Sequence, residues 1–203
     1  VMWIPEDNEM NDRAEILDFM KRFSFATIIT SKDNIPTATH LPFLVRIANE
    51  KVILTSHFAK ANEHWKSIEN NTILVIFNEP HAYISPKLYD KELNVPTWNY
   101  LAVHAYGKGI IIPQSDKVMD VLNATVLNYE QDYQEQWQAL PENYKRNLSK
   151  GIVAFEIEVF DLQAKKKISQ NKTEAEKHRI IDSLSKSEDS NERLIAAYML
   201  KNQ

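Results

Sequence analysis

Lys51-Val-Ile-Leu-Thr-Ser-His-Phe-Ala-Lys-Ala-Asn-Glu-His-Trp65 is the stretch that most constrains the fold of this chain. Residues 52–54 are apolar and β-favouring, which predicts a buried strand. From His57 onward the residue types favour a helix, so Thr55 and Ser56 are expected where the strand meets the helix. Orphan backbone N–H groups and the positive end of the helix dipole converge at such a junction, which suits it to binding a phosphate.

Lys60 lies one turn into the expected helix. Its ammonium group would add a full positive charge to the phosphate site. The alternative is that Ser56 only caps a surface helix, which is the ordinary role of a serine at a helix start.

Length and composition describe an ordinary globular chain. It has 203 residues, of which 43% are hydrophobic and 26% charged, enough for one domain or one domain with an appendage. The net charge of −4 argues against broad affinity for nucleic acid or an anionic membrane. No apolar run approaches the roughly 20 residues of a membrane span, and residues 1–6 do not resemble a signal peptide. We therefore expect a cytoplasmic protein.

The chain has no cysteine, which excludes disulfides, thiolate catalysis and cysteine-ligated metal centres. Its six histidines are scattered, so we predict no metal site, and one built from distant histidines stays open as the alternative. With only three glycines, neither a dinucleotide-binding glycine loop nor a Walker-type phosphate loop can be built.

Hydrophobic patterning predicts many short strands with few intervening helices. This order favours a mainly β (α+β) antiparallel barrel with peripheral helices over a doubly wound sheet. A domain over residues 1–171 and a C-terminal helical extension over residues 172–203, packed on the same domain, are expected. The expected strands cover residues 25–30, 40–47, 52–54, 72–77, 81–86, 97–107 and 153–160, and the helices residues 12–23, 57–70, 115–129, 141–148, 173–184 and 191–200.

The strand expected over residues 97–107 has two different faces. One face is ordinary core. The other carries aromatic rings with polar tips, which suits a planar ligand or a subunit interface; the alternative is that the rings only fill a barrel wall. The residues of this aromatic face are Trp98, Tyr100, Ala102, His104 and Tyr106.

Several short motifs, in a fixed order along the chain, resemble those of the PaiB-type FMN-binding negative transcriptional regulators. That family is a branch of the FMN-binding split barrels related to pyridoxamine-phosphate oxidases. The motifs are Met2-Trp-Ile-Pro5, His40-Leu-Pro-Phe-Leu44, Ser56-His-Phe-Ala-Lys-Ala-Asn62 with Trp65, Ala82-Tyr-Ile-Ser-Pro86, Pro96-Thr-Trp-Asn-Tyr100, Val103-His-Ala-Tyr-Gly107, Gly151-Ile152 with Phe155-Glu-Ile-Glu158, and Lys167-Ile-Ser-Gln-Asn171.

The resemblance implies a six-stranded antiparallel split barrel that forms a homodimer, with FMN at the subunit interface. Relatives often have arginine where this chain has Lys60, and a histidine where it has Tyr106. The cofactor-binding residues that the resemblance implies, some of them from the partner subunit, are Thr55, Ser56 and Lys60 at the phosphate, His57 and Asn62 at phosphate or ribityl oxygens, and His40, Trp98, Asn99, Tyr100, Lys167, Gln170 and Asn171 along the ring or ribityl chain.

The implied function is a flavin-dependent repressor of genes for sporulation and secreted proteases, and no catalytic residue is predicted. Direct DNA binding has little support, because residues 172–203 hold six basic and six acidic residues and the only compact basic cluster is Lys165–Lys167. The first alternative is a flavin-dependent oxidoreductase, either a nicotinamide-dependent flavin reductase or a relative of pyridoxamine-phosphate oxidase. A haem-binding role with His57 or His104 as axial ligand is the other.

Overall fold

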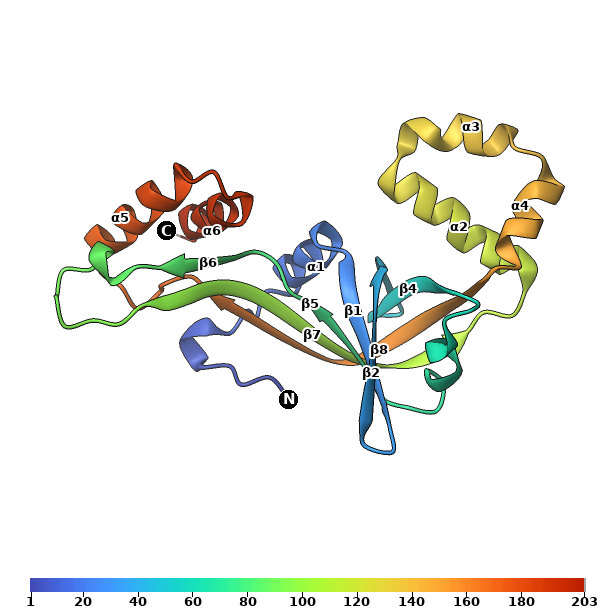
Figure 1. Ribbon diagram of the computed structural model, residues 1–203, viewed down its shortest axis with the longest axis horizontal. Helices are drawn as coiled ribbons and strands as arrows, with labels where there is room; N and C mark the ends of the chain where they lie inside the picture. Colours follow the sequence, from blue (N-terminus) through green and yellow to red (C-terminus); the bar gives the residue numbers. More distant parts are fainter. Residues whose placement is uncertain (203) are drawn as a thin grey trace. The chain divides into compact units, whose positions relative to one another are not determined.

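The fold is mainly β, and the computed structural model describes residues 1–202 (Figure 1). Eight strands form one sheet in the described chain, rather than the six that the resemblance implied. They are β1 (Phe25–Lys32), β2 (Ile35–Pro42), β3 (Leu44–Ala48), β4 (Lys51–Ala59), β5 (Ile73–Phe77), β6 (His81–Ile84), β7 (Thr97–Ile111) and β8 (Ile152–Lys167).

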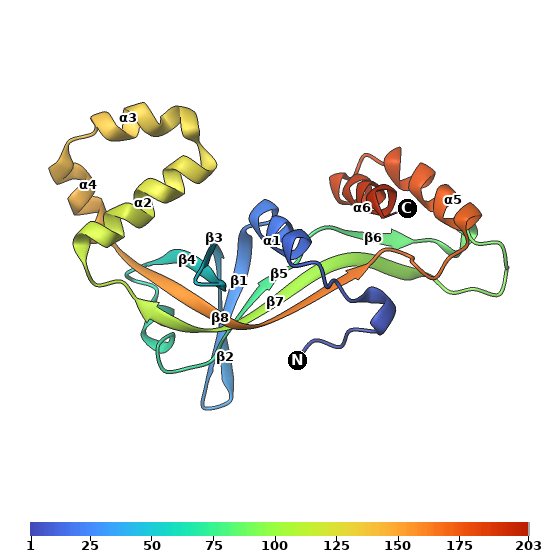
Figure 2. The same ribbon diagram turned by 180° about the vertical axis from the view of Figure 1, so that it is seen from behind.

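The strands follow the order β2-β1-β5-β7-β8-β4-β3, and β6 pairs with β7 beside this path. The β1–β2, β1–β5, β3–β4, β4–β8 and β6–β7 pairs are antiparallel. Figure 2 shows the β3–β4 hairpin from the opposite side. Its tight turn is at Asn49 and Glu50, both with positive φ, and lies between the strands predicted to end at residue 47 and to begin at residue 52.

Helices connect and flank the strands, as the sequence predicted. Among the helices described for residues 1–202, none combines the length and apolar character that a membrane span requires. The α-helices are α1 (Arg13–Arg22), α2 (Ser115–Tyr129), α3 (Gln134–Ala139), α4 (Glu142–Ser149), α5 (Glu174–Ser185) and α6 (Ser190–Lys201), and the 3₁₀ helices are η1 (Glu6–Asn8), η2 (Glu63–Ser67), η3 (Pro86–Leu88) and η4 (Gln131–Tyr133).

The chain divides into two compact units, and each consists of separate segments. The first unit comprises residues 1–16, 78–103 and 163–203, and the second comprises residues 17–77 and 104–162. The long strands β7 and β8 contribute residues to both. The boundary predicted at residue 171 stays a prediction; α5 and α6, which follow it, belong to the first unit.

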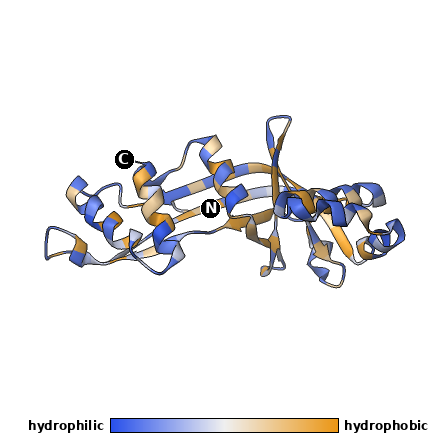
Figure 3. Cartoon of the chain, turned by 90° about the horizontal axis from the view of Figure 1, so that it is seen from above, coloured by the Kyte–Doolittle hydropathy of each residue, from blue (hydrophilic) through white to orange (hydrophobic). Residues whose placement is uncertain are grey.

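Four buried phenylalanines form the centre of the second unit. Phe43 packs edge-on against Phe77 and Phe155, with ring centroids 6.1 and 6.2 Å apart. Phe58 stacks on Phe155 at 4.8 Å. All four rings are at most 1% exposed, so they make up a continuous apolar core. Figure 3, coloured by hydropathy, shows hydrophobic segments along the strands.

The strand predicted over residues 40–47 is wrong, because two strands replace it. Pro42 ends β2 since it has no N–H to donate to the sheet. Phe43 then leaves the ladder, donates its backbone N–H to the Ser24 carbonyl at 2.8 Å and buries its ring in the core. The chain resumes as β3 at Leu44.

The C-terminal helices of the first unit agree with the prediction. Thr173 caps α5 and forms a capping box with Glu176, whose carboxylate also accepts the backbone N–H of Asp90 at 3.0 Å. These hydrogen bonds hold the pKa of Glu176 below its usual value. Ile180 and Leu184 bury the inner face of α5, and α6 packs against β6.

Candidate functional site

The predicted junction of strand and helix after residue 54 is wrong. β4 continues to Ala59, because His57, Phe58 and Ala59 pair with residues 152–154 of β8. The only helix that follows before β5 is the five-residue η2, which begins at Glu63. An extended chain advances about 3.3 Å per residue, so Thr55 and Ala59 are about 13 Å apart. Thr55, Ser56 and Lys60 therefore do not surround one helix N-terminus.

The Thr55 and Ser56 side chains point to opposite faces of β4. Ser56 faces inward with Leu54 and Phe58, and its hydroxyl donates to the Pro42 carbonyl at 2.6 Å. Thr55 faces outward and donates to Glu156 at 3.4 Å. There Thr55 lines a cavity of about 600 Å³, which we name the sheet–helix cavity. It is bounded by β3, β4, β7, β8 and α2. Its lining includes Arg46, Lys117, Asp120 and Glu156.

Lys60 lines a different cavity of the second unit. This basic pocket has a volume of about 340 Å³ and is lined by Lys60, Trp65, Ser115, Ser149, Lys150 and apolar residues that include Ile112. Its lining, all within the described chain, thus includes two lysines and two serines and contains no carboxylate. Within the protein, Lys150 Nζ donates to the Asn147 amide oxygen at 3.1 Å, and the Ser149 hydroxyl donates to the Arg146 carbonyl at 2.9 Å. Such a donor set favours an anion.

The backbone of Lys60 is held firmly at the edge of the basic pocket. Its N–H donates to the Gly151 carbonyl at 2.8 Å, and its carbonyl accepts the indole N–H of Trp65 at 3.1 Å. Ser115 is the first residue of α2, where the helix dipole is positive. No local sequence pattern indicates Lys150, which follows α4 directly.

Asn62 takes part in an internal network rather than facing a cavity. Its amide donates to Thr39 at 3.1 Å, and its oxygen caps η2 by accepting the His64 N–H at 3.1 Å. The ring nitrogens of His64 contact the Thr39 and Thr30 hydroxyls at 2.9 and 3.0 Å. Burial lowers the pKa of His64, so its neutral ring ties η2 to β1 and β2.

His57 and His40 are the other predicted site residues of the second unit. His57 is half-buried on the outward face of β4, and burial lowers the pKa of its imidazole. His40 is exposed on β2, where Nδ1 contacts the Thr27 hydroxyl at 2.9 Å and the ring stacks on Phe25.

Trp98, Asn99 and Tyr100 lie on β7 within the first unit, and the two predicted faces are confirmed there. Asn99 is fully buried and exchanges hydrogen bonds with Ser169 at 2.9 and 3.2 Å. Trp98 is 52% exposed, and its ring lies 5.8 Å from both His81 and Tyr83. The exposed face of β6 and β7 is therefore aromatic, and Asn99 serves the interior.

The Lys165–Lys167 cluster is occupied by contacts inside the first unit. Lys165 is buried, donates to the Trp3 carbonyl at 3.2 Å and lies over the rings of Trp3 and Tyr100 at 4.9 and 5.2 Å. Lys167 donates to the Thr97 hydroxyl.

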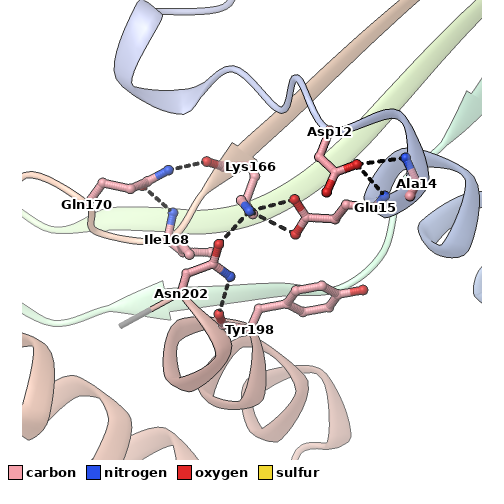
Figure 4. A network of polar contacts seen from close by, with 8 residues as sticks. All are labelled: Asp12, Ala14, Glu15, Lys166, Ile168, Gln170, Tyr198 and Asn202. Carbon is pink, nitrogen blue, oxygen red and sulfur yellow. Dashed lines mark hydrogen bonds and ion pairs between the residues drawn. The ribbon is translucent and has the colours of Figure 1, made fainter.

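Lys166 pairs with Glu15 at 2.8 Å and donates to Asn202 at 2.6 Å, so it joins α1, β8 and the end of α6 (Figure 4). Gln170 closes the adjacent turn by donating to the Lys166 carbonyl and accepting the Ile168 N–H at 2.8 Å. Asn171 is exposed.

Six of the predicted cofactor residues thus lie in each unit. Within the second unit, Thr55 and Lys60 line two different cavities, and the other four line neither. Across residues 1–202, no group of three or more His, Asp or Glu side chains is placed to hold a metal ion.

Comparison with known proteins identifies relatives over almost the whole chain. Residues 2–161 match the family described as "Putative FMN-binding domain". The chain is 37% identical to the protease synthase and sporulation protein PAI 2 of Bacillus subtilis, over 98% of this chain and 96% of that protein. It is 30% identical to an uncharacterized protein of Emericella nidulans, over 71% of this chain and 73% of that protein.

Two solved structures have a similar fold despite low sequence identity. The FAD and heme binding protein from Mycobacterium smegmatis gives a TM-score of 0.63 at 13% identity, over 79% of this chain and 73% of that chain. The flavocytochrome Anf3 from Azotobacter vinelandii gives 0.62 at 13% identity, over 78% and 68%. The predicted mainly β, antiparallel split barrel is confirmed.

FMN consists of a dianionic phosphate, a polyhydroxyl chain and a planar, largely apolar ring. The lining of the basic pocket offers Lys60, Lys150 and the Ser115 hydroxyl for the phosphate, and Trp65 and Ile112 for apolar contact. The donor set therefore fits a phosphorylated flavin. With the family match over residues 2–161 and the 37% identity to PAI 2, the chain belongs to the PaiB-type family of FMN-binding proteins.

Proposed function

We propose that this protein is a homodimeric negative regulator of transcription that binds FMN and acts in the cytoplasm on genes for protease synthesis and sporulation. The supporting observation is the likeness to PAI 2, a protein named for these processes, which extends over 98% of this chain. A likeness over nearly the full length of both proteins favours a shared role, because it includes both units and the C-terminal helices.

We further propose that the basic pocket holds the FMN phosphate. Lys60 and Lys150 supply the charge, and Ser115 supplies a hydroxyl donor. The Ser149 hydroxyl already donates to the Arg146 carbonyl at 2.9 Å. When bound, the flavin ring supplies one- and two-electron redox chemistry.

The exposed aromatic face of β6 and β7 is the proposed dimer contact. Its rings are His81, Tyr83 and Trp98, of which Trp98 is 52% and Tyr83 is 46% exposed. Aromatic side chains are enriched in subunit interfaces because they bury much apolar area at little entropic cost. Trp98→Ala should therefore shift the protein from dimer to monomer in light scattering, with an unchanged far-ultraviolet circular dichroism spectrum.

The Lys165–Lys167 cluster is poorly suited to bind DNA. All three ammonium groups are engaged by carbonyl, carboxylate or hydroxyl acceptors of the first unit. A phosphate backbone would have to displace these partners before it could bind there.

The proposed function is tested on the purified protein in three steps. Flavin absorption bands that persist through desalting after addition of FMN support cofactor binding, and their loss contradicts it. A shift of promoter DNA at a stated salt concentration then tests direct repression. Oxidation of a nicotinamide cofactor above the background rate of free FMN would instead favour the oxidoreductase.

A further inference from the structure

The sheet–helix cavity of the second unit has no role in the proposed binding of the FMN phosphate. Its volume of about 600 Å³ lies within the roughly 300–1,000 Å³ range of small-molecule sites. Its floor is the outer surface of β3, β4, β7 and β8, and one wall is α2.

The floor of this cavity carries one cation and one carboxylate. Arg46 of β3 pairs with Glu156 of β8 at 2.7 Å, and Thr55 donates to the same carboxylate oxygen at 3.4 Å. The Arg46 and Glu156 side chains are 48% and 35% exposed. A ligand in the cavity can therefore reach both groups without breaking the pair.

The helical wall repeats this arrangement of charges. Lys117 and Asp120 both line the cavity from α2, three residues apart and hence on one side of the helix. The cavity lining also contains apolar side chains, among them Ile110, Val121 and Ala124.

This balance of charge selects a particular kind of ligand. A phosphate would meet two carboxylates, and a simple ammonium compound would meet two cations, so both are disfavoured. A molecule with one positive and one negative group can contact a cation and a carboxylate on both the floor and the helical wall.

We propose that the sheet–helix cavity binds a zwitterionic small molecule with an apolar body, of the class of apolar α-amino acids. The ligand carboxylate contacts Arg46 and Lys117, and its ammonium group contacts Glu156 and Asp120. Its apolar side chain packs on the apolar residues of the lining. Such a site gives the protein a metabolite input that is separate from the flavin, and it does not depend on where the FMN phosphate binds.

Isothermal titration calorimetry of the full-length protein tests this site. The ligands are L-leucine, L-methionine and L-phenylalanine, together with N-acetyl-L-leucine, which lacks the ammonium charge, and L-leucinamide, which lacks the carboxylate. At least one free amino acid should bind, and both leucine derivatives should bind about tenfold more weakly or worse than L-leucine, because each loses one charged contact. Absence of binding by all three amino acids, or equal binding of either derivative, would overturn the proposal.

Matched variants then distinguish this cavity from the flavin site. Lys117→Gln and Asp120→Asn should each weaken amino-acid binding about tenfold, whereas Asp116→Asn, on the same helix but outside the lining, should not. FMN affinity should be unchanged in Asp120→Asn. A loss of FMN affinity in that variant would assign the cavity to the flavin and overturn this proposal, whereas an unchanged FMN affinity in Lys60→Glu would contradict only the proposed phosphate site.

Discussion

Two groups of lysines in this chain have opposite surroundings. Lys60 and Lys150 face a pocket whose described lining contains no carboxylate. Lys165, Lys166 and Lys167 are next to one another in sequence, yet each ammonium group is taken by an acceptor within the first unit. The denser cluster is thus the less available one. Lys150 also donates within its own unit, to the Asn147 amide oxygen at 3.1 Å, but that contact is exposed, whereas Lys165 is buried among its partners.

The largest expected effect comes from reversing a charge in the basic pocket. Lys60→Glu should weaken FMN binding about a hundredfold or more, since repulsion replaces attraction at a partly desolvated phosphate. Quenching of flavin fluorescence measures the affinity. The control is Lys32→Glu on the exposed β1–β2 hairpin, which should bind FMN normally; equal affinity of both variants would place the phosphate elsewhere.

Removing an engaged lysine should instead destabilise the protein. Lys165→Ala leaves the Trp3 carbonyl and two ring faces without their cation, and we expect a loss of about 2 kcal/mol in the free energy of unfolding. Denaturant unfolding measures this loss. FMN affinity should stay unchanged, and a variant that unfolds normally but binds FMN poorly would reverse our assignment of the two groups.

The second lysine of the basic pocket should have a smaller effect than the first. Lys150→Ala removes one charge without adding the opposite one, so FMN affinity should fall about tenfold, or about 1.4 kcal/mol. The matched variant is Lys108→Ala, which lies on β7 outside the pocket lining. If the Lys150 and Lys108 variants bind FMN alike, Lys60 alone carries the phosphate charge.

The Lys166–Glu15 pair should contribute modestly to stability. Both side chains are largely buried, at 12% and 18% exposure, so Glu15→Gln should cost about 1 kcal/mol or more of unfolding free energy. The comparison is Glu63→Gln, which breaks the exposed pair with Lys66 and should change the stability by less than about 0.5 kcal/mol. Equal losses would mean that burial does not distinguish the two pairs.

The smallest expected effect is the pH dependence of stability that comes from the buried His64. Burial lowers the pKa of His64 below its ordinary 6.5, so below pH 6.5 the unfolded chain takes up a proton that the folded chain resists. Stability should therefore fall as the pH drops from about 7.5 to 5.5. This fall should be smaller in His64→Gln and unchanged in His178→Gln, which alters an exposed residue of α5; an identical fall in all three proteins would contradict the argument.

Local sequence patterns predicted most helices and strands, but they did not predict that the chain continues as a strand from His57 to Ala59. The helices predicted to begin at residues 12 and 173 are capped by Asp12 and Thr173, and the predicted alternation from Trp98 to Ala105 is confirmed. These features have local causes, as does the turn at Asn49 and Glu50. The helix expected from His57 is wrong because Phe58 stacks on Phe155, almost a hundred residues away, and strand pairing then overrides helix propensity.

The candidate site was predicted only in part, for a related reason. Lys60 was found by its local motif, and it does line a pocket. Lys150 joins it through the packing of α4 against the rest of the second unit, which no local pattern indicates. The internal partners of Ser56, Asn62, Asn99 and Lys167 are likewise distant in sequence.

Comparing FMN with riboflavin tests the central claim most directly, because the two differ only in the phosphate. The ratio of their dissociation constants should be large in the natural chain and fall close to one in Lys60→Glu, with riboflavin affinity little changed. A ratio that survives in Lys60→Glu would show that the phosphate is held outside the basic pocket.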